Sequence, residues 1–171
     1  MNTREIISSI LSGFLLIALQ VVLVKNFVLF DVGFCYVYVA ILIYLPMNWN
    51  AMSCMLAGLI VGFIIDSFYD TIGIHASVGV LIGFLKPQIL KILTPMGGYD
   101  NISSYRQLSL RWNISFSFVI LVIHHIYLFI LEAAGFDLFF FTILKIILSV
   151  FFSLLAIQLY RTIFFTSYGR E

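Results

Sequence analysis

The chain has 171 residues, of which 63% are hydrophobic and 10% are charged, and its mean hydropathy is +1.13. Soluble domains carry about 25% charged residues, so this composition excludes an ordinary soluble protein and indicates an integral membrane protein. The apolar residues form continuous runs instead of the alternating pattern of a membrane β-barrel, which predicts an all-α fold. The net charge is +1 and there is no basic run, so nothing indicates nucleic acid as a partner. We expect a single polytopic membrane domain over residues 1–171.

Two apolar runs open the chain. Residues 6–24 are long enough for one membrane helix, and no cleavage site follows them, so we expect this helix to be retained. The second run is expected as a helix over 32–45 that ends before Pro46 and is broken early by Asp31 and Gly33. If Asp31 stays among the headgroups, the remainder spans only about 21 Å of a hydrocarbon core of about 30 Å. The second helix is therefore expected to be tilted, half-inserted or preceded by a re-entrant piece.

The centre of the chain predicts a pair of helices, over 51–66 and 74–92, joined by a short polar turn. Each helix carries glycines spaced four residues apart: Gly58, Gly62, Gly79 and Gly83. Small residues at this spacing allow helix backbones to approach closely, because lipid supplies no hydrophobic force between helices. We therefore expect these glycines to set the packing of the two helices.

The turn between these helices contains Asp66, Asp70, Gly73 and His75. Asp66 and Asp70 would lie one helical turn apart if the helix continued through both. Ionisable groups at membrane depth are expensive, which favours a functional site for binding a partner or for holding the turn. The alternative is an ordinary polar turn that reaches water on the far side of the membrane.

The second half of the chain begins with residues 96–111, whose glycine pair and polar cluster predict a loop. Two further helices are expected over 112–131 and 138–160, which brings the total to roughly six membrane helices. With a cytoplasmic N-terminus, the positive-inside rule places most cations in the cytoplasm, namely Arg4, Lys86, Lys91, Arg106, Arg111, Arg161 and Arg170. The acidic groups and one histidine then gather at the outer face: Asp31, Asp66, Asp70, His75, Glu132 and Asp137. This acidic rim either receives a partner or is the ordinary complement of the cation bias.

Lys145 is expected inside the membrane, where it would pair with Asp66 or Glu132 or extend toward the interface. His124 and His125 are adjacent, so they point about 100° apart and do not form the i, i+4 pair of a helical zinc site. We expect buried, hydrogen-bonded imidazoles there and no metal.

Motifs of catalysis are missing from the sequence. There is no Gly-x-Ser-x-Gly elbow, P-loop, His-Glu-x-x-His or Cys-x-x-Cys. Asp66 and Asp70 also have no counterpart later in the chain, as an inverted-repeat transporter would require. Composition and spacing alone therefore indicate a polytopic membrane protein with an outward acidic face and glycine-packed central helices, and no motif calls for a cofactor.

The chain resembles the rod shape-determining membrane protein family MreD, and the central stretch carries most of the resemblance. Size, helix count and the short second helix ending at Pro46 agree with that family along nearly the whole chain. The residues that carry the resemblance are Gly58-Leu-Ile-Val-Gly62-Phe-Ile-Ile-Asp66, Phe68, Asp70-Thr71, Gly73-Ile-His75-Ala76, Phe84-Leu85-Lys86-Pro87, Pro95 and Gly97-Gly98-Tyr99. One departure is Ile72, where members of the family often carry proline, which makes the turn less rigid.

The resemblance implies a non-enzymatic scaffold of the bacterial inner membrane with both termini in the cytoplasm. Such proteins bind the single-pass coiled-coil protein MreC and support peptidoglycan synthesis and rod cell shape. The elongation machinery also contains MreB and the polymerase RodA with its transpeptidase. We also expect contact with membrane lipid, and a homo-oligomer within the complex is a further option.

The family's fold is similar to the substrate-binding subunits of energy-coupling-factor vitamin transporters, which supplies an alternative function. In that case Asp66, Asp70 and His75 would form the floor of an outward pocket. A lipid-headgroup enzyme would use the same carboxylates but lacks a recognisable base and nucleophile.

Overall fold

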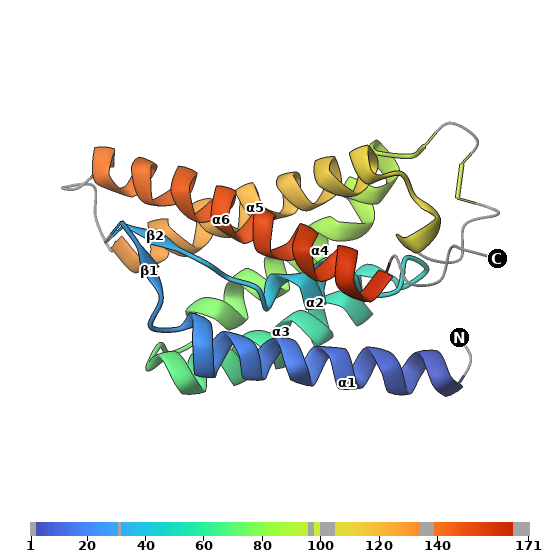
Figure 1. Ribbon diagram of the computed structural model, residues 1–171, viewed down its shortest axis with the longest axis horizontal. Helices are drawn as coiled ribbons and strands as arrows, with labels where there is room; N and C mark the ends of the chain where they lie inside the picture. The colour runs from blue at the N-terminus through green and yellow to red at the C-terminus, as the bar shows by residue number, and fades with distance from the viewer. Residues whose placement is uncertain (1–2, 31, 96–97, 100–104, 134–138, 166–171) are drawn as a thin grey trace.

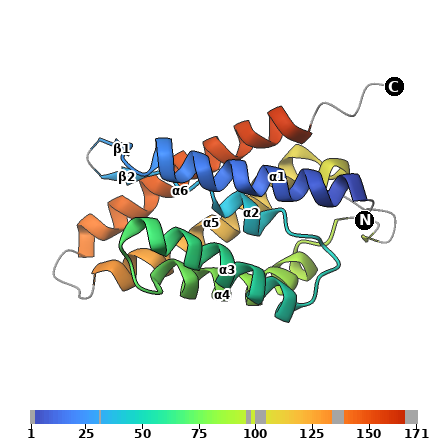
Figure 2. The same ribbon diagram turned by 90° about the horizontal axis from the view of Figure 1, so that it is seen from below.

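The structure is a computed structural model that describes residues 3–30, 32–95, 98–99, 105–133 and 139–165. The chain folds as a helical bundle with one short β-hairpin (Figures 1 and 2). Its elements in order are α1 (Thr3–Leu19), the π-helical η1 (Gln20–Val24), β1 (Val28–Leu29), β2 (Gly33–Phe34), α2 (Val39–Ile43), α3 (Ala51–Tyr69), α4 (Ile74–Ile92), the 3-10 helix η2 (Tyr105–Gln107), α5 (Leu110–Ala133) and α6 (Phe139–Phe165).

Three helices in the described part of the chain are long and apolar enough to cross a membrane: Ala51–Tyr69, Leu110–Ala133 and Phe139–Phe164. A shorter apolar helical stretch covers Ile10–Val24. Large apolar side chains on these helices are exposed, as expected for surfaces that face lipid instead of water. The all-α prediction is confirmed in its main part, since the described chain is mostly helical and adds only a short β-hairpin. The three long apolar helices support a membrane protein, while the total of roughly six spans and the similarity to energy-coupling-factor subunits stay predictions.

The helices pair as two hairpins around a central short helix. α3 packs along α4, α5 packs along α6, and α2 contacts α1, α3, α4 and α5 from the middle of the bundle (Figures 1 and 2). Tyr38, Val39, Ala40 and Ile43 of this central segment are fully buried. The turn between α3 and α4 lies at the same end of the bundle as the β-hairpin and the end of α5, opposite the start of α1 and the end of α6 (Figure 1).

The expected helix over 32–45 is wrong as a single element. Its first part forms β2, which pairs antiparallel with β1, and only Val39–Ile43 is helical. Side chains of α6 satisfy backbone amides in β2 and in the segment after it: Phe34 N donates to Ser149 Oγ at 2.9 Å, and Tyr36 N donates to Ser153 Oγ at 2.9 Å. Non-helical backbone inside a membrane protein requires such internal partners, because lipid offers none.

Gln20 holds the same segment from the other side. Its Oε1 accepts from Val37 N at 2.7 Å, and its Nε2 donates to Cys35 O at 3.2 Å and to Tyr69 Oη at 2.6 Å. Gln20 is fully buried, so a single side-chain amide ties the start of η1 to the extended segment and to the end of α3. Elsewhere the bounds differ less: α3 continues past 66 to Tyr69, α5 begins at Leu110 and α6 reaches Phe165.

Candidate functional site

The four glycines of the central hairpin all lie in the interface between α3 and α4. A Cβ built on Gly58 would lie 2.1 Å from the carbonyl oxygen of Gly79, and one on Gly62 would lie 2.3 Å from the carbonyl oxygen of His75. A Cβ on Gly83 would lie 2.5 Å from the backbone of Cys54. A real Cβ atom does not lie this close to another heavy atom, so no side chain fits at these positions and the two helices touch backbone to backbone. This contact fixes the position of the turn that joins them.

The turn itself depends on left-handed backbone at two positions. α3 ends at Tyr69, and Asp70 follows with a φ of 56°, a conformation that aspartate tolerates better than most residues. Gly73 precedes α4 with a φ of 83°, where glycine avoids the strain of a side chain. Because glycine has no side chain, it cannot cap the first amides of α4.

Asp66 supplies the cap that Gly73 lacks. Its Oδ1 accepts from His75 N at 3.0 Å, and its Oδ2 accepts from Ala76 N at 2.9 Å. Thr71 Oγ1 also donates to Asp66 Oδ1 at 2.6 Å. The carboxylate lies at the positive end of the α4 dipole and satisfies amides that have no partner within the helix. The Asp66 side chain therefore links the end of α3 to the start of α4 and stabilises the turn between them.

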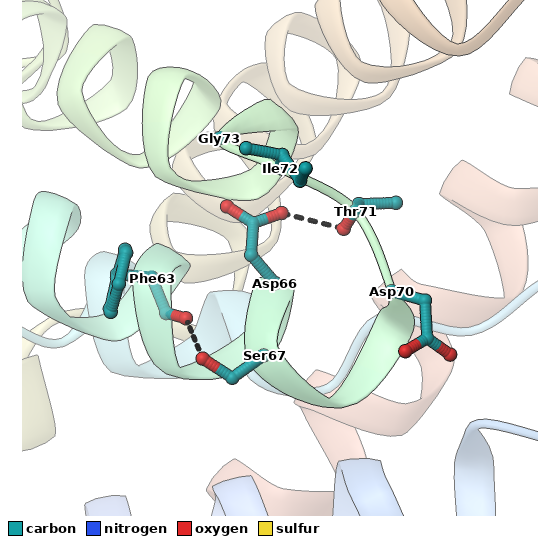
Figure 3. Close-up of a pocket in the computed structure, with 7 residues that line it drawn as sticks. All are labelled: Phe63, Asp66, Ser67, Asp70, Thr71, Ile72 and Gly73. Carbon is teal, nitrogen blue, oxygen red and sulfur yellow. Dashed lines mark hydrogen bonds between the residues drawn. The ribbon is translucent and has the colours of Figure 1, made fainter.

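Asp66 and Asp70 are not brought together. Figure 3 shows the Asp66 carboxylate directed toward Thr71 and the Asp70 carboxylate directed away from it. Both line an open pocket of about 450 Å³, whose full lining is Phe63, Asp66, Ser67, Asp70, Thr71, Ile72 and Gly73. Asp70 and Ile72 are exposed there, so this pocket is a feature of the outer surface of the turn.

His75 connects the cap to the interior. Its Nδ1 lies 3.0 Å from Asp66 Oδ1 and 3.1 Å from Thr71 Oγ1, and the side chain is buried. The imidazole packs against the rings of Tyr36 and Tyr69 at centroid distances of 5.9 and 5.2 Å. It also lines a second, smaller pocket of about 90 Å³ between the turn and α5.

All three histidines of the chain gather around Tyr36. His124 Nε2 lies 2.6 Å from Tyr38 Oη, while His125 contacts Leu121 O through Nδ1 at 2.7 Å and Ser153 Oγ through Nε2 at 3.3 Å. These are the contacts of buried, hydrogen-bonded imidazoles. Among the described residues, no group of three or more His, Cys, Asp or Glu side chains is arranged to hold a metal ion.

Lys145 contacts Glu132 and not Asp66. Lys145 Nζ lies 2.8 Å from Glu132 Oε2, and it sits over the rings of Phe34 and Phe129 at 4.6 and 4.4 Å. Aromatic faces attract a cation, so the ammonium group is held by one carboxylate and two rings. Asp66 is already bound to the start of α4.

Lys86 differs from the expectation that it faces the cytoplasm. It is buried, and Nζ donates to Leu45 O at 2.7 Å and to Pro46 O at 3.3 Å. These carbonyls follow α2, where the helix dipole is negative and the last carbonyls need donors. Lys86 therefore ties α2 to α4, a role that charge patterning could not reveal.

Part of the expected charge arrangement falls outside the described residues. This applies to Asp31 and Asp137 and to the side chains of Arg4, Arg106 and Arg170. Among the described residues, Asp70 follows α3 and Glu132 lies in the last turn of α5, both exposed, while Lys25 donates to Phe68 O in the last turn of α3. No family model, curated protein or solved structure matches the chain.

Proposed function

We propose that the protein is a non-enzymatic scaffold of the bacterial inner membrane that serves cell elongation. In this role it binds a single-pass coiled-coil protein of the MreC type and supports peptidoglycan synthesis and rod shape. The observation that carries the proposal is the backbone contact between Gly58 and Gly79, which holds the turn from Asp66 to His75 in one geometry. A fixed turn at one end of the bundle suits the presentation of a docking surface.

The use of the polar groups supports a scaffold more than an enzyme. Asp66 caps α4, Lys86 binds carbonyls after α2, and Gln20 satisfies the extended segment. Each of these groups is hydrogen-bonded to the backbone within the fold, which leaves it unsuited to proton transfer or nucleophilic attack. The proposal includes the elongation machinery around MreB and RodA with its transpeptidase, and both termini of the chain in the cytoplasm.

The alternative function is that of a vitamin-binding subunit of an energy-coupling-factor transporter. Sites for molecules of that size are usually concave and have volumes of about 300–1,000 Å³. The enclosed space beside His75 is about 90 Å³, and the larger pocket lies on the exposed side of the turn. The first pocket is too small for such a molecule, and the second is large enough but open to the surface, which favours the scaffold over the transporter subunit.

A tagged purification from native membranes in mild detergent, followed by mass spectrometry, distinguishes the two functions. The scaffold predicts co-purification of a single-pass coiled-coil protein with peptidoglycan synthases. Recovery of a membrane coupling subunit with ATPases, or of a bound vitamin, would overturn it in favour of transport.

A pair of variants links this experiment to the hairpin. Gly62→Leu introduces a Cβ that would lie 2.3 Å from His75 O, whereas a Cβ on Gly13 of α1 would meet nothing within 4 Å. We expect the Gly62 variant to lose the partner while Gly13→Leu keeps it. Equal partner recovery from both variants, at equal amounts of folded protein, would remove the hairpin from the docking surface.

A further inference from the structure

One residue that lines the small pocket, His75, carries a buried ring nitrogen without a hydrogen-bond partner among the described residues. The pocket is lined by Tyr36, Tyr69, Thr71, Ile74, His75, Leu128 and Glu132. His75 is 3% exposed, and its Nε2 has no hydrogen-bond partner within the part of the chain that the structure describes. A buried polar atom normally has a partner, because leaving it unpaired costs free energy.

The hydrogen bonds around His75 determine what its free nitrogen can accept. Thr71 donates its hydroxyl proton to Asp66 Oδ1 at 2.6 Å. The Nδ1 of His75, 3.0 Å from the same oxygen, then carries the imidazole proton and donates it to Asp66. In the neutral imidazole with this tautomer, Nε2 presents a lone pair, and the Thr71 oxygen has acceptor capacity left as well. The pocket therefore calls for a hydrogen-bond donor.

The rest of the lining favours a donor with positive charge. Glu132 lines the pocket with a side chain that is 46% exposed, and its ion pair with Lys145 uses Oε2. A carboxylate has about four acceptor positions, so Glu132 can receive a second cation. Tyr36 and Tyr69 contribute aromatic rings, which attract ammonium and guanidinium groups; Lys25 Nζ already lies 5.4 Å from the centre of the Tyr69 ring.

We infer that this pocket receives a single protonated nitrogen group, an ammonium or a guanidinium, which donates to His75 Nε2 and Glu132. A volume of about 90 Å³ suits the end of one side chain and not a whole metabolite. The occupant is a basic side chain of the protein partner, and this identification rests on the proposed scaffold function. A free organic amine offers the same chemistry, and the test separates the two sources.

The test uses the full chain in detergent micelles with nitrogen-labelled histidine, titrated with methylguanidinium chloride. The His75 signal is assigned by substituting the three histidines one at a time. We expect a saturable shift of the His75 Nε2 resonance. Glu132→Gln should weaken binding about tenfold, because it removes a charged acceptor.

Asp70→Asn is the matched control, since it also removes one exposed negative charge but lies in the other pocket. It should leave the affinity for methylguanidinium unchanged. Absence of a saturable shift in the wild-type chain, or equal weakening in the Glu132 and Asp70 variants, would overturn the inference.

The source of the group is read from the purified complex. If the partner supplies it, the His75 resonance is already shifted in the complex and does not respond to methylguanidinium. A response that persists in the complex, or a small amine released on denaturing the chain alone, overturns the partner side chain as the occupant. Methylguanidinium binding without recovery of any protein partner would reject the scaffold function and leave the pocket assignment standing.

Discussion

Gly58 and Gly79 each occupy the space that a side chain on the other would need. A Cβ on Gly58 would lie 2.1 Å from the oxygen of Gly79, and a Cβ on Gly79 would lie 2.2 Å from the oxygen of Gly58. The contact is reciprocal, and both opposing atoms belong to the backbone, so neither helix can adjust by rotating a side chain. Association of α3 with α4 thus depends on the absence of side-chain atoms, as expected where lipid weakens hydrophobic association.

The first prediction concerns Gly58→Ala. In an open helix this change stabilises by about 1 kcal/mol, because alanine has the higher helix propensity. At position 58 we expect the opposite sign, a loss of about 1–3 kcal/mol, because the helices must move apart. Thermal unfolding in detergent micelles measures the difference. Gly13→Ala is the control, since nothing lies within 4 Å of its Cβ, and it should be neutral or stabilising. Similar unfolding temperatures for both variants would contradict the prediction.

The second prediction compares Asp66→Asn with Asp70→Asn. Asp66 uses both oxygens to accept from the backbone amides of His75 and Ala76, and an asparagine can offer only one acceptor oxygen. One buried amide then faces an NH₂ group, which should cost about 1–3 kcal/mol. Asp70 is exposed, and asparagine tolerates its positive φ, so the second variant should unfold like the wild type. Denaturant titration checks both values, and equal losses would show that Asp66 is not a cap.

The sequence was informative where structure follows from local composition. The apolar content predicts a mostly helical membrane protein, because every backbone group in lipid must be satisfied within a helix or a barrel. Glycines spaced four apart also draw attention to α3 and α4 before any coordinates are known. The sequence indicated that burying the Asp66 carboxylate in a membrane is costly in free energy. It could not show that Asp66 caps α4, because its amide partners lie 9 and 10 residues away across a turn.

The extended segment before α2 shows why the remainder was not predictable. Gly33 and Asp31 indicated a break, but the side chain that receives Phe34 N belongs to Ser149, 115 residues further along the chain. A serine in an apolar helix usually bonds its own backbone, so Ser149 gave no sign of a distant partner. The prediction that Lys86 faces the cytoplasm was wrong for a similar reason, since its acceptor is a backbone carbonyl, which no pattern of charges can indicate.

The third prediction addresses Ser149 and Ser153. Replacing either with alanine removes the acceptor of a backbone amide in the extended segment, and each change should cost about 1–3 kcal/mol. Ser67→Ala serves as the control, because its exposed hydroxyl donates to Phe63 O in its own helix. That variant should stay within about 0.5 kcal/mol of the wild type. Hydrogen exchange at the amides of Phe34 and Tyr36 reports the same loss locally. Unchanged protection in the alanine variants would refute the role of the serines.

The fourth prediction uses a double-mutant cycle at Leu45. Its carbonyl accepts from Lys86 Nζ at 2.7 Å and from Tyr105 Oη at 3.1 Å. Burial raises the pKa of the Tyr105 hydroxyl well above its usual value, so it remains protonated and able to donate. Lys86→Met or Tyr105→Phe alone leaves this carbonyl one donor, whereas the double variant leaves it none. We therefore expect the double variant to lose at least about 1 kcal/mol more than the sum of the single losses, measured by thermal unfolding. Strict additivity would mean that the two donors do not share the carbonyl.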